Sequence, residues 1–174
     1  MFIPRYQPFS GARWSLRHAD MVLCPGYWTP PQLVNGMALL TRIDESGKPH
    51  TWMSISPMEI ESQEIGCQHA RGHVVVMGLG MGWAAANAAL HPAVSQVTVV
   101  EFDPEVIAAV SQSGIFDQLP ESARARVRVV QGDMHRTGND VLLQRLCQRL
   151  YARMGGAQQG NPGSGGRGLP HGNE

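Results

Sequence analysis

The strongest constraint on the fold is an alternation of valine-rich runs and helix-forming runs that begins at residue 73. Such runs, when glycine, proline or polar clusters bound them, are typical of buried strands and the helices between them. The expected strands are 73–77, 96–102 and 127–130, and the expected helices are 83–90 and 104–110. Strands that alternate with helices pair in parallel through right-handed crossovers. We therefore expect an α/β fold built on a parallel sheet.

A glycine-rich loop and two acidic residues follow the three expected strands. Gly78, Gly80 and Gly82 precede the first helix, Glu101 ends the second strand, and Asp133 follows the third. Glycines let a ligand approach the backbone, and a helix N-terminus offers amide donors. A carboxylate at the second strand end can accept from both hydroxyls of a ribose, and one after the third can accept from an adenine amino group. Each feature alone is common without a ligand, so the prediction of a nucleoside-containing ligand rests on their order.

The glycine spacing argues against a dinucleotide cofactor. A dinucleotide fingerprint has small residues at its first, third and sixth positions. Counted from Gly78, the sixth position is Trp83, whose indole would obstruct close packing of the helix on the strand. The loop has glycine at positions one, three and five instead, which disfavours NAD.

Two segments together resemble the class I S-adenosylmethionine-dependent methyltransferases. They are Val-Val-Val-Met-Gly-Leu-Gly-Met-Gly at 74–82 and the run from Leu-His-Pro to Val-Val-Glu-Phe-Asp-Pro-Glu-Val-Ile at 90–107. Within that superfamily the chain is most similar to the spermidine-synthase-like branch, over about residues 72–143. The resemblance implies a Rossmann-like three-layer parallel sheet of methyltransferase type and S-adenosylmethionine as the cofactor.

The same resemblance assigns roles to the five candidate site residues. Gly78, Gly80 and Gly82 match the loop that packs against the methionine part of the cofactor. Glu101 matches the acid that holds the ribose, and Asp133 matches the acid near the adenine. No catalytic residue and no metal ligand are assigned.

The chain departs from the family pattern after residue 143. The family has a fourth strand of the form Asp-Val-Ile/Leu-x-x-Asp, whose last acid acts in aminopropyl transfer. Here Asp140-Val141-Leu142-Leu143 is followed by Gln144 and Arg145, and no later segment supplies further strands. We therefore expect a truncated sheet with an open edge, which favours self-association as a homo-oligomer and incomplete catalysis.

The residues before the parallel sheet predict an arm, a hairpin and a helix. Residues 1–35 lack a sustained period and predict an arm with short local structure. Runs at 37–43 and 50–55 flank a Gly-containing connection and predict a β-hairpin. The segment Ser56–Glu59 combines an N-cap, a proline and a glutamate in a capping box, so a helix is expected over about 57–70.

The expected domain organisation has three parts. Residues 1–56 form the N-terminal arm and β-hairpin, residues 57–154 form the Rossmann-like cofactor-binding domain, and residues 155–174 form a disordered Gly-rich tail. An amphipathic helix is expected at 140–154, with its apolar side covering the sheet edge and its Gln/Arg side in solvent.

Charge and cysteine usage restrict the partners and the compartment. Fourteen Lys/Arg balance fourteen Asp/Glu, so bulk charge disfavours nucleic acid and membrane surfaces as partners. Three scattered cysteines do not predict a disulfide scaffold, and with no recognisable secretion signal they favour the cytoplasm. Cys67, His69 and His73 lie close in sequence, but they lack the partner pair that a zinc site needs.

Three functional hypotheses follow. The first is an S-adenosylmethionine-binding methyltransferase of unknown acceptor, with a spermidine-synthase-like aminopropyltransferase relative as its variant. The second is a non-catalytic binding remnant of that fold. The third is an NAD-dependent oxidoreductase, which Trp83 disfavours.

Overall fold

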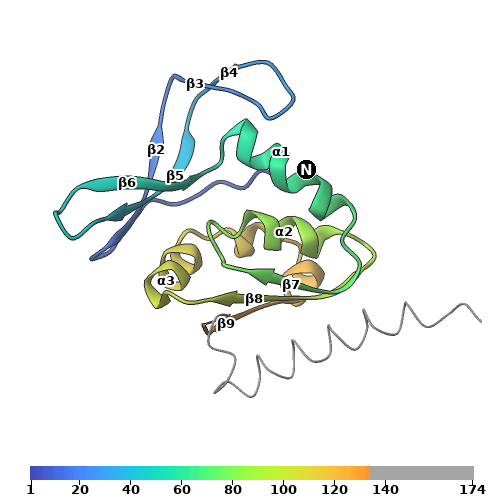
Figure 1. Ribbon diagram of the computed structural model, residues 1–174. Coiled ribbons are helices and arrows are strands. Elements are labelled where there is room, and N and C mark those ends of the chain that lie inside the picture. The colour runs from blue at the N-terminus through green and yellow to red at the C-terminus, as the bar shows by residue number, and fades with distance from the viewer. Residues whose placement is uncertain (134–174) are drawn as a thin grey trace, which may run out of the picture. The chain divides into compact units, whose positions relative to one another are not determined.

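The computed structural model describes residues 1–133, and these residues form a mixed α/β structure (Figure 1). Their strands make a four-stranded antiparallel sheet, a two-stranded ribbon and a three-stranded parallel sheet. Three expectations lie outside the described residues: the helix at 140–154, the departure from the fourth-strand pattern after 140–143 and the tail at 155–174. So does Cys147.

The antiparallel sheet has the order β1-β2-β5-β6. Its strands are β1 (Phe9–Ser10), β2 (Trp14–Ala19), β5 (Met37–Ile43) and β6 (Pro49–Ser54). The expected hairpin is thus confirmed as β5 and β6. Its connection is held by Asp44, whose carboxylate accepts hydrogen bonds from the backbone amides of Ser46 and Lys48, both at 2.9 Å.

The description of residues 1–35 as an arm is wrong for β2. This strand pairs with β5 from Trp14 to Ala19. Its side chains alternate in burial at the start, with Trp14 4% exposed and Leu16 1% exposed around the less buried Ser15. That alternation is the period-two signal of a strand with one buried face, and the surrounding prolines and polar residues obscured it.

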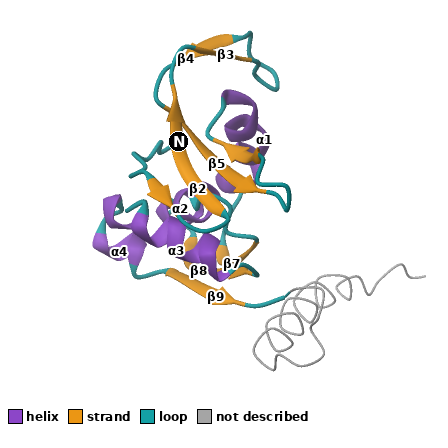
Figure 2. Ribbon diagram, turned by 90° about the vertical axis from the view of Figure 1, so that its left-hand side faces the viewer, coloured by secondary structure: helices purple, strands orange, loops and turns teal. Residues whose placement is uncertain are grey.

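A narrow ribbon of β3 (Val22–Cys24) and β4 (Gln32–Val34) extends beyond the ends of β2 and β5 (Figure 2). Glu61 anchors the loop between the two ribbon strands. Its carboxylate accepts from the backbone amides of Tyr27 at 2.6 Å and Trp28 at 2.9 Å, and from the Thr29 hydroxyl. The hydroxyl of Thr29 and these amides hold the pKa of Glu61 below its usual range, although burial opposes the shift.

Helix α1 (Pro57–Gln68) follows β6 and begins where the sequence predicts. Ser56 is the N-cap, and its hydroxyl accepts from the Glu59 amide at 3.4 Å. In a capping box the Glu59 side chain would accept from the Ser56 amide, but here it contacts Ser54 instead. The Glu59 carboxylate accepts from the amide of Ser54 at 2.6 Å and from its hydroxyl at 3.0 Å, so Glu59 ties the helix to the end of β6.

The parallel sheet has the order β7-β8-β9, and both pairings are parallel as expected. Its strands are β7 (Gly72–Met77), β8 (Val94–Glu101) and β9 (Val127–Gln131). Helices α2 (Trp83–Leu90) and α3 (Pro104–Gln112) connect them, with Asp103 as the expected N-cap of α3. Strand β8 begins two residues before the prediction and ends one residue before it. The 3₁₀ helix η1 (Phe116–Gln118) and the short helix α4 (Glu121–Arg124) were not expected.

One cluster of buried side chains joins the two larger sheets. It contains Trp14 and Leu16 from β2, the alanines of α2, and Val97 and Val99 from β8. The extended N-terminal residues are fastened to the same core, because Phe2 and the buried Asn87 exchange two hydrogen bonds of 2.8 and 3.0 Å. Alanines allow α2 to lie close to β8, and this proximity positions the loop between β7 and α2.

Several expectations stay predictions. The domain division at residues 56 and 154, the three-layer arrangement, self-association and the cytoplasmic location belong to this group. Among residues 1–133, no helix combines the length and the hydropathy that a membrane span requires.

Candidate functional site

The glycine loop between β7 and α2 adopts a backbone that side chains disfavour. Gly78, Gly80 and Gly82 have φ values of 82°, 52° and 76°. The Gly78 amide donates to the Val100 carbonyl at 2.8 Å, which extends the β7–β8 pairing into the loop. A Cβ on Gly78 would meet nothing within 4 Å, whereas one on Gly80 would clash with the Met53 side chain. The loop thus has open space beside Gly78, whereas the Met53 side chain of β6 lies against Gly80.

Gly82 has a packing role. It is the N-cap of α2, and a Cβ there would lie 3.0 Å from Val110 and 3.3 Å from Ile115. This glycine therefore permits the close approach that the sixth residue provides in a dinucleotide fingerprint. Trp83, which occupies the sixth position here, is buried at the start of α2.

Glu101 connects the ends of β7 and β8. One carboxylate oxygen accepts from the Leu79 amide in the glycine loop at 2.7 Å, and the other accepts from the Asp103 amide at 2.9 Å. The Glu101 carbonyl accepts from the Gly132 amide at 2.9 Å, which brings the residues after β9 beside it. Each carboxylate oxygen retains further lone pairs, so Glu101 can still accept from a ligand.

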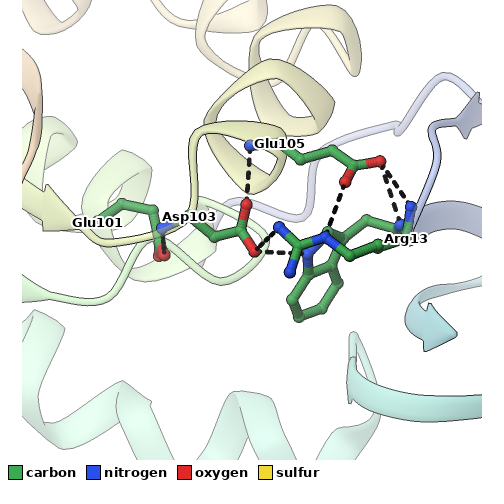
Figure 3. A network of polar contacts seen from close by, with 5 residues as sticks. Arg13, Glu101, Asp103 and Glu105 are labelled. Atoms are coloured by element: carbon green, nitrogen blue, oxygen red, sulfur yellow. Dashed lines mark hydrogen bonds and ion pairs between the residues drawn. The ribbon is translucent and has the colours of Figure 1, made fainter. Parts of the chain in front are cut away.

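The acidic residues after Glu101 hold the antiparallel sheet against α3 (Figure 3). The Asp103 carboxylate accepts from the Glu105 amide at 3.0 Å, from the Trp14 indole at 2.9 Å and from Arg13 at 2.8 Å. Glu105 accepts from the Arg13 amide at 2.9 Å. Burial raises the pKa of Asp103, but the Trp14 and Glu105 donors and the Arg13 charge outweigh it and leave that pKa below its ordinary value.

A cavity of about 500 Å³ lies at the carboxyl end of β7. Its walls are the end of β6 at 52–55, the start of α1, the loop region 76–81, the first turn of α2 and Glu101. Pockets of about 300–1,000 Å³ are usual for small ligands and cofactors. The volume of the cavity lies in that range, and the cavity lies at the strand end where the sequence analysis expects a ligand.

The cavity brings together three of the five predicted site residues. Gly78, Gly80 and Glu101 line it. Gly82 lies directly beyond, at the start of α2. Asp133, the last described residue, is half-buried after β9 and is not among the described residues that line the cavity.

The sequence analysis did not predict the part of the cavity wall that β6 and α1 contribute. It contains Trp52, Met53, Glu59 and Gln63. Trp52 is 60% exposed and packs edge-on against Trp14 at 5.6 Å between ring centroids. The capping pattern at Ser56 placed Glu59 at a helix start, but no spacing rule relates that helix to a loop about twenty residues later.

The charges on the cavity wall have one sign. Glu59 and Glu101 are acidic, and no Lys, Arg or His is among the described residues that line the cavity. A cationic ligand is favoured in such a cavity, and an anion such as a pyrophosphate is disfavoured.

Trp83 also lines the cavity, with one polar atom unsatisfied. The residue is 4% exposed, and its buried indole N–H has no hydrogen-bond partner within residues 1–133. An unpaired buried donor costs about 1–3 kcal/mol. An acceptor on a ligand would recover that cost.

The side chains of Cys67, His69 and His73 do not point to a common site, because each contacts a different group. The Cys67 thiol contacts the Ala84 carbonyl, His69 contacts the Ile65 carbonyl, and His73 contacts the Thr98 hydroxyl. No group of three or more His, Cys, Asp or Glu side chains within residues 1–133 is placed to hold a metal ion. Burial, with the Glu64 charge, raises the pKa of the Cys67 thiol to about 11, so it is not a nucleophile at neutral pH.

No protein-family model matches the chain, and no curated protein matches its sequence. Several solved structures are similar to part of this chain. One is the methyltransferase domain of bacterial CtHen1 (19% identity over 42% of this chain and 36% of that one, TM-score 0.33). Another is the glycopeptide N-methyltransferase MtfA complexed with S-adenosyl-L-homocysteine, with 28% identity over 42% of this chain and 28% of that one and a TM-score of 0.35. A third is spermidine synthase from Thermotoga maritima, with 15% identity over 74% of this chain and 50% of that one and a TM-score of 0.36. The chain spans half or less of each structure.

Proposed function

We propose that the cavity beside the glycine loop binds S-adenosylmethionine and that the chain acts as a methyltransferase whose acceptor is not specified. One observation carries the proposal. At the carboxyl end of adjacent parallel strands, Glu101 is hydrogen-bonded to the glycine loop in a cavity whose described charges are all negative.

The residues present fit the cofactor. The open space beside Gly78 leaves backbone for the methionine part to contact, and the free lone pairs of Glu101 suit the ribose hydroxyls. The first-turn amides of α2 have no intrahelical partner and suit a carboxylate. In this proposal Asp133 follows β9 on the adenine side, as the family resemblance implies.

The wall charges favour this cofactor over NAD. S-adenosylmethionine carries a sulfonium and an ammonium, whereas a dinucleotide carries a negatively charged pyrophosphate. Repulsion from Glu59 and Glu101 would act on the pyrophosphate without a described basic side chain to offset it.

The bound cofactor supplies an electrophilic methyl carbon on its sulfonium. Displacement at that carbon demands mainly that acceptor and donor are aligned, a task for the residues that hold them. Trp52 and Met53 form the wall nearest the glycine loop from β6, so they would bound the space on the acceptor side.

Aminopropyl transfer is the second candidate. Decarboxylated S-adenosylmethionine lacks the carboxylate and is therefore more cationic, which the acidic wall also favours. A non-catalytic binding protein would show binding of these ligands without product.

Titration calorimetry on the full chain tests the proposal with S-adenosylmethionine, S-adenosylhomocysteine, decarboxylated S-adenosylmethionine and NADH. We expect the adenosyl compounds to bind and NADH not to bind. Tighter binding of the decarboxylated form would favour aminopropyl transfer. Binding of NADH alone would contradict the proposal.

A further inference from the structure

We propose that Glu59 binds the cationic end of the ligand, while Glu101 binds its nucleoside. The inference rests on the proposed function and deepens it, because it assigns a residue on a different element to charge recognition. Neither the glycine loop nor the acids after the parallel strands point to Glu59.

The position of Glu59 is fixed by two contacts on one side of its carboxylate. Oxygen Oε2 accepts from the Ser54 amide at 2.6 Å and from the Ser54 hydroxyl at 3.0 Å. Oxygen Oε1 has no hydrogen-bond partner among the described residues. Glu59 lines the cavity, and because Ser54 already holds Oε2, Oε1 can accept from a ligand with little further loss of side-chain freedom.

The surroundings leave the charge of Glu59 without a described counterion. Glu59 makes no ion pair with a residue in the part of the chain that the structure describes, and no basic side chain there lines the cavity. Trp52 and Trp83 line the same space, and aromatic faces also favour cations. A sulfonium or ammonium is therefore the charge that this wall can accept.

Glu101 has a different set of contacts. Both of its oxygens already hold backbone amides on the loop and the α3 side, at the ends of β7 and β8. It lies on the parallel sheet, whereas Glu59 lies on α1. Two acids on separate elements of one cavity can thus contact separate parts of one ligand.

The test compares two ligands in two variants. S-adenosylmethionine carries the cationic methionine part, whereas 5′-methylthioadenosine keeps the nucleoside and the sulfur without any charge. Glu59→Gln preserves an oxygen for Ser54 and removes the charge. It should weaken S-adenosylmethionine binding by about ten- to hundred-fold and leave 5′-methylthioadenosine binding nearly unchanged. Glu101→Ala should weaken both ligands by similar factors.

Glu64→Gln is the matched control, because Glu64 lies on the same helix, contacts Gln68 and is not among the described cavity residues. It should change neither affinity. Equal loss of both ligands in Glu59→Gln, or no loss, overturns the inference and leaves the proposed function standing. Failure of the unaltered chain to bind either ligand overturns both.

A measurement on the unaltered chain guards against a variant that does not fold. Added salt screens a charge pair but not contacts to a neutral nucleoside. The affinity for S-adenosylmethionine should fall as salt rises, while that for 5′-methylthioadenosine stays level. Parallel salt dependence of the two ligands overturns the inference.

Discussion

At the scale of single residues, Glu101 links the fold to the candidate site. Its carboxylate holds the Leu79 amide of the glycine loop and the Asp103 amide before α3. Glu101 also lines the cavity, so in the proposed function one carboxylate orders the loop and contacts the ligand. The sequence placed Glu101 correctly at a strand end, but it did not show that Glu101 orders the loop.

Glu101→Ala should weaken S-adenosylhomocysteine binding by about 1.5–3 kcal/mol, the range for hydrogen bonds to a charged group. Calorimetry on the folded variant measures the change. Glu105→Ala is the control, since Glu105 accepts from the backbone amides of Arg13 and Trp14 but does not line the cavity. Unchanged affinity in Glu101→Ala would remove Glu101 from the site.

Gly80→Val should abolish ligand binding and leave most of the fold intact. A side chain at φ 52° is strained, and its Cβ would displace Met53 beside the loop. Gly36→Val provides the matched control, because Gly36 has φ 62° with nothing within 4 Å and lies outside the cavity. Circular dichroism and calorimetry on the same samples separate folding from binding, and normal binding by Gly80→Val would show that the loop is only a turn.

At the scale of elements, the antiparallel sheet and α3 are joined through Asp103. This residue caps α3 and accepts from Trp14 and Arg13 (Figure 3). The cap was predicted from Asp103-Pro104, because capping depends on neighbours in sequence. The contacts with Trp14 and Arg13 were not, because they cross about ninety residues and no local pattern encodes them.

The pKa of Asp103 gives a pH dependence with a definite sign. That pKa is lower in the folded state than in the unfolded chain, where it is about 3.9. The ionised Asp103 carboxylate therefore stabilises the folded state fully at neutral pH. This stabilisation is lost as the pH falls below about 4 and through the lower pKa of the folded state.

Asp103→Asn keeps an N-cap but removes this titration. We expect it to lower the free energy of unfolding at pH 7 and to reduce the difference from the unaltered chain as the pH falls below about 4. Urea unfolding at a series of pH values measures both. If the free energies of unfolding of Asp103→Asn and the unaltered chain differed by the same amount at every pH, the pH dependence would not come from Asp103.

The elements themselves differ in how far the sequence determined them. Strands β7 to β9 and helices α2 and α3 were predictable, since valine runs and proline boundaries are local signals. Helix α4 has four residues and was not, because so short a helix has almost no period. The wall from β6 and α1 needed tertiary packing, which single-sequence patterns do not contain.

At the scale of the whole described molecule, residues 1–133 share one principal core. The side chains of Trp14 and Leu16 belong to the same cluster as those of α2 and β8. Asn87 extends this core to the N-terminal residues by exchanging hydrogen bonds with Phe2 and by donating to the Trp83 carbonyl.

Asn87→Ala should lower the free energy of unfolding by about 1–3 kcal/mol, because it leaves the backbone amide and carbonyl of Phe2 without their partner. Asn35→Ala is the control, since Asn35 accepts from an exposed amide of Met21 on the ribbon. Urea denaturation compares the two variants. Equal, small effects would contradict a role for Asn87 in fastening the N-terminal residues.

The fastening of Phe2 to Asn87 also has a consequence during synthesis. The two residues are 85 positions apart, so at about 5–20 residues per second the ribosome makes Asn87 roughly 4 to 17 s after Phe2. The apolar side chains of Trp14 and Leu16 therefore emerge before α2 and β8, with which they share one core, have been made. Slower translation lengthens the time for which this apolar face is exposed in the nascent chain.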